Sequence, residues 1–199
     1  MPRPKKFDRT EAVSTAMREI WRDGYEAASV QHLSEVLGIT RSSFYNAFGS
    51  RDDLFHEALA AYRAVVPELP SPDPSAGLVL PRLTSLARAM CRFNAEHGFR
   101  GCMITNSVAE LCPAGEGPGA ELGKIMRTRI NRLEKLFERA KAQRELPATA
   151  NSRTLALAYQ NLLFGLNVLG KALQNEADLW RIAEATLRGL AIYAPPGSA

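Results

Sequence analysis

VQHLSEVLGITRSSFYNAF, residues 30–48 of the chain, has the pattern of two short helices joined by a tight turn. Leu33 and Leu37 are four residues apart and therefore share one face of the first helix. Gly38 can adopt a positive φ angle, which ends that helix. Phe44 and Phe48 are again four apart and define the inward face of the second helix. The stretch therefore predicts a helix-turn-helix.

The second of these helices carries polar and cationic side chains opposite its two phenylalanines. Thr40 can cap its N-terminus by accepting a hydrogen bond from a backbone N–H group. Arg41 is the leading candidate for reading a base, because a guanidinium group can pair with O6 and N7 of guanine. Tyr45 lies one turn later on the same face. The same spacing also suits a helical hairpin whose outer face is simply solvated, so spacing alone does not establish DNA binding.

Residues 7–62 resemble the TetR family of bacterial transcriptional repressors across a whole DNA-binding domain. The matching residues are Ile20, Trp21, Gly24, Tyr25, Ser29, Leu33, Gly38, Ile39, Thr40, Phe44, Tyr45, Asn46, Ala47, Phe48, Arg51, Leu54 and Phe55. The family more often has Lys followed by Glu where this chain has Arg51 and Asp52, which keeps the charge pattern. The remaining two thirds of the chain resemble the family only in length and helical character.

The resemblance and the polar pattern together give a set of expected DNA contacts. A basic N-terminal arm would follow the phosphates or enter the minor groove, although a solvated tail has the same composition. The start of the first helix of the motif would hold a phosphate on its free N–H groups. His32, on that turn, is expected to be merely solvated. The expected DNA-binding residues are Arg3, Lys5, Ser29, Gln31, Thr40, Arg41, Ser42, Ser43, Tyr45, Asn46 and Arg51.

The composition favours an all-α protein with no membrane-spanning segment. The chain has 199 residues, of which 46% are hydrophobic, and its formal net charge is +4. Residues 1–64 hold nine Lys or Arg and nine Asp or Glu, so charge alone does not predict DNA binding there. The charged N-terminus lacks a signal peptide, and the most apolar run is interrupted by polar residues. We therefore expect a cytoplasmic protein.

The chain is expected to contain two helical domains and about nine helices. Prolines at 67, 70, 72 and 74 interrupt the helical pattern and mark a boundary. This divides the chain into a helix-turn-helix DNA-binding domain over residues 1–65 and a larger ligand-binding and dimerisation domain over residues 75–199. In the second domain, apolar periodicity predicts helices over residues 81–98, 102–111, 120–143, 155–173 and 177–193.

The resemblance implies a small-molecule effector bound in the second domain. Residues 100–111 resemble a Gly-Cys-hydrophobic segment of a family subgroup, in which this helix lines the ligand cavity and moves. Helical position and this analogy give the candidate ligand-binding residues Phe93, His97, Met103, Asn106, Glu110 and Met126. Residues 124–144 hold eight Lys or Arg and two Glu, which suits either an anionic partner or an ordinary solvated helix face.

The segment 155–173 is apolar on more than one face, which indicates burial on both sides. In a small domain this pattern suggests a subunit interface, and the resemblance implies a two-fold dimer built from the last two helices of each chain. The candidate interface residues are Leu155, Tyr159, Leu162, Leu166, Leu169, Ile182, Thr186 and Leu190. A homodimer of this kind would bind a near-palindromic double-stranded DNA operator.

Two alternatives to a ligand-responsive repressor are a redox-sensing repressor and an enzyme. Cys102 lies near the start of a short helix beside Arg100, so an activated thiol there could make the chain a redox- or electrophile-sensing repressor; the alternative is a buried, inert cysteine. An enzyme is not expected, because no Gly-x-Ser-x-Gly motif, metal-ligand pair or phosphate loop occurs. His97 with Cys91 and Cys102 is the one candidate metal site for an enzyme, but nothing in the spacing supports it. We therefore expect no metal and no cofactor.

Overall fold

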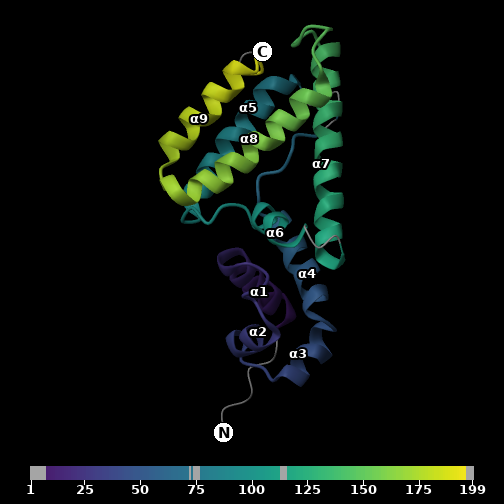
Figure 1. Ribbon diagram of the computed structural model, residues 1–199, viewed down its shortest axis with the longest axis vertical. Coiled ribbons are helices and arrows are strands. Elements are labelled where there is room, and N and C mark those ends of the chain that lie inside the picture. The colour runs from purple at the N-terminus through teal and green to yellow at the C-terminus, as the bar shows by residue number, and fades with distance from the viewer. Residues whose placement is uncertain (1–7, 72, 74–76, 113–115, 196–199) are drawn as a thin grey trace. The chain divides into compact units, whose positions relative to one another are not determined.

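The computed structural model describes residues 8–71, 73, 77–112 and 116–195, in which every regular element is an α-helix (Figure 1). The nine helices there confirm the expected all-α fold. They are α1 (Arg9–Asp23), α2 (Val30–Leu37), α3 (Arg41–Phe48), α4 (Arg51–Arg63), α5 (Val79–Glu96), α6 (Met103–Leu111), α7 (Gly117–Ala142), α8 (Ser152–Leu173) and α9 (Glu176–Gly189). Within the described residues, none of these helices combines the length and apolarity needed to cross a membrane.

The helices belong to two compact units. Unit 1 consists of residues 1–66 and 106–122, and unit 2 consists of residues 67–105 and 123–199. Helices α6 and α7 therefore each contribute one end to unit 1 and the other to unit 2. The sequence placed the whole of 75–199 in one domain, whereas the packing adds residues 106–122 to the N-terminal unit. Which unit binds DNA and which binds a ligand stays a prediction at this point.

The aromatic core of unit 1 fixes its first four helices. Phe44 and Phe48 on α3 are 0% and 4% exposed, and Leu33 on α2 is 1% exposed, as the spacing predicted. Trp21 on α1 packs edge-on against Tyr62 on α4, with ring centroids 4.9 Å apart. Burial of large aromatic side chains contributes about 1.5–3 kcal/mol each. The core therefore holds helices that are individually short.

Side-chain oxygens start each of these four helices. The hydroxyl of Ser29 accepts from the backbone N–H of His32 at the start of α2, at 3.2 Å. Thr40 does the same for Ser43 at the start of α3, at 3.1 Å, as predicted. Asp8 and Ser50 cap α1 and α4 in the same way. Such caps contribute about 0.5–2 kcal/mol each, which explains why the boundaries fall at these residues.

Unit 2 is built on α5, α8 and α9, which pack against one another (Figure 1). The Tyr159 hydroxyl of α8 is fully buried and donates to the Leu83 carbonyl of α5 at 2.7 Å. Asn94 of α5 donates to the Asn167 side chain of α8 at 3.1 Å, and both residues are buried. A Cβ at Gly170 would lie 3.1 Å from Asn94 Oδ1, so a glycine there permits this close approach. These polar contacts fix the register of α5 against α8.

The largest differences from the expected helix bounds in unit 2 are at the start of α8 and at the end of α9. Helix α8 begins at Ser152 rather than 155, because the Asn151 side chain caps it by accepting from the Thr154 N–H at 2.9 Å. Helix α9 ends at Gly189 rather than 193. The backbone of Ala191 has a φ of 56°, which is incompatible with continuing a right-handed helix.

Helix α5 has an unusual cap, since its own N-cap residue Leu78 provides no side-chain hydrogen bond. Instead Glu145, far along the chain, accepts from the backbone N–H groups of Val79 at 2.7 Å and Leu80 at 2.8 Å. A carboxylate at this end also interacts favourably with the helix dipole.

Replacing this cap should therefore destabilise unit 2. We expect Glu145→Ala to lower the free energy of unfolding by about 1–2 kcal/mol, because two helix N–H groups lose a charged acceptor. Urea unfolding followed by circular dichroism measures the change. Glu96→Ala, at the opposite end of the same helix, is the matched control. Its carboxylate opposes the helix dipole, so an equal loss of stability there would contradict this explanation.

Candidate nucleic-acid interface

The turn between α2 and α3 sets the angle at which α3 leaves the core. Gly38 has a φ of 66° and lies in the left-handed region, where glycine is the favoured residue. Its N–H donates to the Glu35 carbonyl at 3.1 Å, and the Ile39 N–H donates to the Ser34 carbonyl at 3.0 Å. These two hydrogen bonds end α2. Helix α3 begins at Arg41, two residues after Ile39, so the short turn fixes its direction.

The outer face of α3 is a short row of groups that can form hydrogen bonds. Its exposed members are Arg41, Ser42, Ser43, Tyr45 and Asn46. Tyr45 is 52% exposed, although its ring packs edge-to-face with the buried Phe44 ring, with centroids 5.7 Å apart. The expected outward orientation of these residues is therefore observed. Arg3 and Lys5, which belong to the same expected DNA-binding set, lie outside the described residues.

Arg41 and Gln31 are brought together from two different helices. The Arg41 guanidinium donates to Gln31 Oε1 at 2.7 Å, and the Gln31 amide donates to Glu35 Oε1 at 3.0 Å. An amide is neutral, so the Arg41 charge keeps no direct carboxylate partner in the described residues. A cation of this kind, held in place but not neutralised, is suited to an anionic or guanine-like partner.

The hydroxyl groups at the start of α3 form a compact cluster. The Thr40 hydroxyl lies 2.9 Å from the hydroxyls of both Ser42 and Ser43. Thr40 also serves as the helix cap, so it has a structural role in addition to the expected one. Ser42 and Ser43 remain exposed and can each still donate or accept a further hydrogen bond.

Arg51, at the start of α4, is anchored rather than freely solvated. Its guanidinium carbon lies 3.9 Å from the centre of the Tyr25 ring, and its Nη2 atom lies 3.9 Å from the Glu26 carboxylate. The Tyr25 hydroxyl hydrogen-bonds to Asp52. Burial, followed by this hydrogen bond, raises the pKa of Tyr25 to about 12, so the phenol stays protonated and donates. The Arg51 side chain is thus held at one edge of unit 1.

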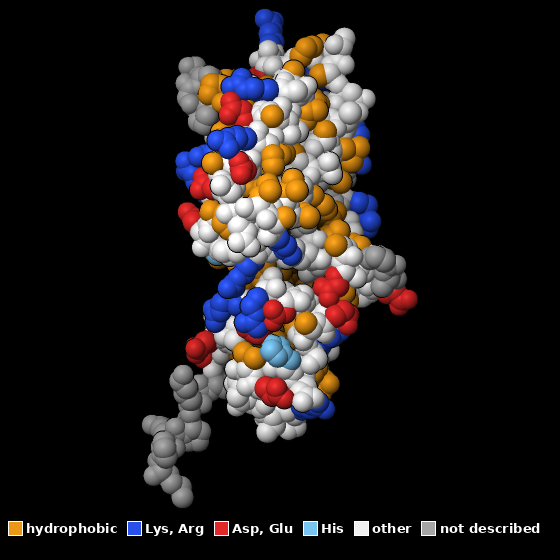
Figure 2. Space-filling model, turned by 60° about the vertical axis from the view of Figure 1, so that its left-hand side comes forward, with side chains coloured by type: hydrophobic (Ala, Val, Ile, Leu, Met, Phe, Trp, Pro, Cys, Tyr) orange, Lys and Arg blue, Asp and Glu red, His pale blue; other side chains and the backbone are white. Residues whose placement is uncertain are grey.

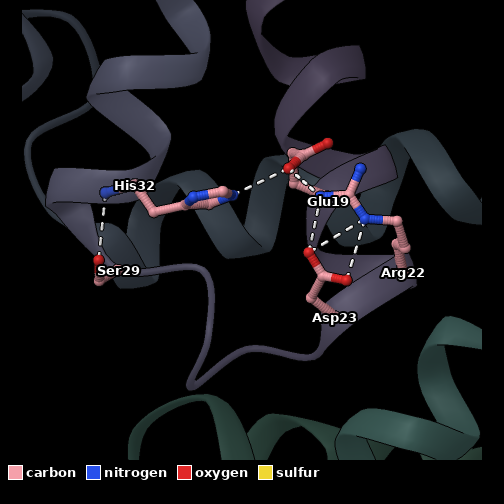
Figure 3. Close-up of polar contacts among 5 residues, drawn as sticks. All are labelled: Glu19, Arg22, Asp23, Ser29 and His32. Atoms are coloured by element: carbon pink, nitrogen blue, oxygen red, sulfur yellow. Dashed lines mark hydrogen bonds and ion pairs between the residues drawn. The ribbon is translucent and has the colours of Figure 1, made fainter.

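A charged cluster joins the end of α1 to the start of α2 (Figure 3). His32 was expected to be merely solvated, and this is wrong: its Nε2 atom lies 2.9 Å from Glu19 Oε2. Arg22 donates to the same Glu19 carboxylate at 2.6 Å and to Asp23 at 2.7 Å. The reason is that Glu19 is only 9% exposed and needs cationic or donor partners. The cluster therefore holds α1 against α2.

Glu19, Asp23 and His32 also form the only group of metal-ligating atoms found within 4.8 Å of one another in the described part of the chain. Arg22 already pairs with both carboxylates, which makes this an ion-pair cluster. The alternative metal site of His97 with Cys91 and Cys102 is not assembled among those residues. The Nδ1 atom of His97 instead donates to the Phe93 carbonyl at 2.9 Å.

The six candidate ligand-binding residues fall into both units. Asn106 and Glu110 belong to unit 1, whereas Phe93, His97, Met103 and Met126 belong to unit 2. Glu110 has a defined role in unit 1, because its carboxylate accepts from the backbone N–H groups of Tyr25 at 2.9 Å and Glu26 at 2.7 Å. Sequence reasoning missed this contact, which joins residues 85 positions apart.

The C-terminal end of α6 is also held tightly to the beginning of α7 in unit 1. A Cβ at Gly119 would lie only 2.3 Å from the Leu111 carbonyl oxygen, so a larger residue does not fit there. His56 on α4 contacts the Glu121 carboxylate of α7. Within unit 1, the end of α6 therefore contacts the segment that follows α1, and the beginning of α7 contacts α4.

The cysteines are largely withdrawn from solvent. Cys91 is fully buried and Cys102 is 7% exposed, while Cys112 is half-buried. Burial raises the pKa of the Cys91 thiol to about 12, which keeps it protonated. Buried thiols react slowly. Cys102 is also buried, so its surroundings do not favour the redox-sensing alternative.

The candidate interface residues of α8 divide into two groups. Tyr159, Leu162 and Leu166 are 0%, 6% and 0% exposed because they form the core of unit 2. A residue that is buried in its own unit offers no surface to a second chain. Leu155, Ile182, Thr186 and Leu190 are partly exposed, and Leu169 is 40% exposed. Their place in a dimer interface stays a prediction.

Besides Leu169, α8 exposes three apolar side chains that are not in the expected interface set. Leu157, Val168 and Leu173 are 47%, 57% and 44% exposed. Figure 2 shows apolar side chains gathered on the surface that α8 and α9 form. Leu157 and Val168 lie on the side of α8 opposite Tyr159, whereas Leu173 lies closer to the Tyr159 side.

Two family models match the chain. Residues 12–58 match the model of bacterial regulatory proteins of the tetR family. Residues 79–186, more than half of the chain, match the model of the tetracyclin repressor-like C-terminal domain. The first match covers the helix-turn-helix and its supporting helices, and the second covers α5 to most of α9.

Curated proteins and solved structures agree with these matches. The chain is 26% identical over 195 residues to the HTH-type transcriptional repressor ComR of Escherichia coli (strain K12), which covers 94% of this chain and 90% of ComR. It is 30% identical over 156 residues to the uncharacterized HTH-type transcriptional regulator YezE of Bacillus subtilis (strain 168), covering 73% of this chain and 76% of YezE. A cysteine mutant of the TetR family transcriptional regulator CifR, solved with 26-bp double-strand operator DNA, is 30% identical with a TM-score of 0.80, covering 94% of this chain and 98% of that chain.

The contact between Glu110 and the segment that follows α1 gives a direct prediction. In Glu110→Ala, amide hydrogen exchange at Tyr25 and Glu26 should accelerate by at least about tenfold, because each N–H loses a hydrogen bond to a charged acceptor. Hydrogen exchange followed by NMR measures this. Glu116→Ala, an exposed acid nearby in the chain, should leave both rates unchanged. Unchanged exchange in Glu110→Ala would show that the contact is not formed in solution.

Proposed function

We propose, from the premise that this chain belongs to the TetR family of bacterial regulatory proteins, that it is a homodimeric repressor released from a palindromic operator by a small molecule. Membership in the family makes the chain a DNA-binding transcriptional regulator. The observation that carries the proposal is the outer face of α3, where Arg41 is held in place without a carboxylate partner.

The DNA-binding step follows from the geometry of unit 1. An α-helix fits the major groove of B-DNA, and the exposed side chains of α3 would then face base edges. Arg41 would pair with guanine, and Tyr45 would pack on the sugar-phosphate or on a thymine methyl group. The N-terminus of α2, where Ser29 is the cap, would face a phosphate. Arg51 would contact the backbone from its position on Tyr25. The CifR structure, which contains operator DNA, supports this assignment.

The dimer would form through the exposed face of α8 together with α9. Leu157, Val168, Leu169 and Leu173 give that face an apolar surface that a second copy can cover. A two-fold dimer of this kind places two recognition helices about 34–36 Å apart, which is one turn of DNA. The operator would accordingly be a near-palindrome. A protein that binds such an operator would act in the cytoplasm.

Effector release would work by a shift between two conformations. A ligand lowers DNA affinity only as far as it binds the non-binding conformation more tightly. Helix α6 is suited to link ligand to DNA, because its first residues belong to unit 2 and its last residues to unit 1. Movement of α6 would alter the contact of Glu110 with the Tyr25 and Glu26 backbone, next to Arg51.

The base-reading role of Arg41 can be tested with one substitution. Arg41→Ala should weaken operator binding by about 1–3 kcal/mol, or about 5–150-fold, while binding to random DNA changes much less. Fluorescence anisotropy at a fixed salt concentration, with an operator selected from random sequence, gives both affinities. Arg181→Ala, an exposed arginine in unit 2, is the control. Equal weakening on operator and random DNA would reduce Arg41 to a phosphate contact.

The dimer interface can be tested at Val168, the large apolar residue of α8 that is most exposed. Val168→Glu should place two charges in the interface and convert the dimer to a monomer, with loss of operator affinity. Sedimentation velocity measures the mass over a concentration series. Lys135→Glu, which changes an exposed charge on α7, is the control. A Val168→Glu protein that remains dimeric would exclude this face of α8.

A further inference from the structure

Arg129 occupies an inward position on α7 in unit 2. It lies one turn before Leu133 and two turns before Phe137, both of which are 0% exposed. Positions three or four apart share one face of a helix, so the guanidinium is directed along the same face as these core residues. Arginine in a protein is always charged. A charge on this face requires a partner, because the cost of burying an unpaired ion is large.

The direct contacts of Arg129 do not supply that partner, and the carboxylate of the exposed residue Glu68 attracts the guanidinium only from beyond ion-pair distance. Its Nε atom donates to Gln160 Oε1 at the long distance of 3.4 Å, and within the described residues the guanidinium makes no ion pair. Arg132, on the next turn, shows what a satisfied arginine looks like in this unit. It donates to the backbone carbonyls of Leu69 at 2.8 Å and Pro70 at 3.1 Å. Arg129 lacks comparable acceptors.

Gln160 is a second and independent sign of a missing partner. It lies on α8 and is only 7% exposed, yet its long contact with Arg129 is its sole side-chain hydrogen bond among the described residues. Its NH2 group therefore donates to nothing in that part of the chain. The nearby Tyr159 hydroxyl cannot serve it, because that group already donates to Leu83. The Nε2 atom keeps some contact with solvent, so this NH2 group can donate to a bound molecule.

The surroundings of Arg129 are both deep and accessible. Burial lowers the pKa of Arg129, which shows how strongly protein atoms surround the guanidinium. Nevertheless Arg129 keeps partial exposure, and so do Met126 and Ile130 on the same face of α7. The Arg129 side chain is therefore largely surrounded by protein and still accessible to solvent.

We propose that unit 2 binds a small carboxylate, with its two oxygens on the Arg129 guanidinium and a further hydrogen bond from the Gln160 amide. This inference rests on the proposed function, since it names the chemical class of the effector. The Gln160 amide then gains an acceptor, and the Arg129 charge gains the bidentate partner that guanidinium geometry favours. Only one of the eight cations in residues 124–144 is given this role.

The ligand-free protein provides the first test. An unpaired buried charge destabilises the fold, and so does the loss of a guanidinium whose removal leaves two backbone carbonyls without a donor. Arg129→Met should therefore raise the thermal unfolding midpoint by at least about 2 °C in a buffer free of carboxylates. Arg132→Met is the matched control and should lower it, because that guanidinium is satisfied by two carbonyls. A lowered midpoint in Arg129→Met would overturn the proposal by showing that Arg129 has a structural role.

The second test uses acetate, butyrate, benzoate and phenylacetate as probes, each compared with its primary amide at equal ionic strength. At least one carboxylate should raise the unfolding midpoint of the wild-type protein by about 2 °C or more at saturation, and the rise should vanish in Arg129→Met and shrink in Gln160→Leu. The amides should have little effect. Carboxylates that act no better than their amides, or that still act on Arg129→Met, would overturn the inference.

Operator binding by the same preparations separates this inference from the proposed function. The Arg129→Met protein should bind operator DNA with wild-type affinity, and the active carboxylate should release only the wild-type protein from DNA. Intact operator binding without any carboxylate effect would remove the inference and leave the regulator intact. Loss of operator recognition by the wild-type protein itself would instead remove the proposed function.

Discussion

Helix α3 depends on the burial of its two phenylalanines. It has eight residues, and an isolated helix of that length is not stable in water. Phe44 and Phe48 attach it to the core of unit 1, while Thr40 satisfies its first free N–H group. The exposed side chains on its other face are therefore presented by a rigid element. The same core contacts that make α3 a helix also fix the direction in which Arg41 and Tyr45 project.

The formal neutrality of the N-terminal segment does not argue against an anionic partner. Its acids are used internally: Glu57 pairs with Arg9, with one N–O distance of 2.7 Å, and Glu19 and Asp23 pair with Arg22. The Arg9–Glu57 pair connects α1 with α4, whereas both pairs of Arg22 lie within α1. Arg41 is bonded to an amide instead, so positive charge remains on the face of α3. The distribution of charge is informative here, whereas the total is not.

Local signals in the sequence were sufficient for the helix-turn-helix and insufficient for the rest of the site. Gly38, Thr40 and the phenylalanine spacing each act over fewer than five residues, so the sequence predicts α2 and α3 closely. The carboxylates of Glu110 and Glu145 cap backbone groups far away in the chain, and no local pattern predicts such a contact. Helix α8 is apolar nearly all round, so periodicity could not separate the side that packs on α5 from the exposed side. The burial of Tyr159, Leu162 and Leu166 within unit 2 could not be predicted for that reason.

In the proposed function, a two-fold dimer reads DNA with α3 in successive major grooves. Hydroxyl-radical footprinting on an operator selected from random DNA is the measurement to make. Such a dimer should protect two patches on one face of the duplex, about 10–10.5 bp apart and related by the symmetry of the site. Selection that yields no preferred sequence, or a footprint with a single protected patch, would contradict the proposed function.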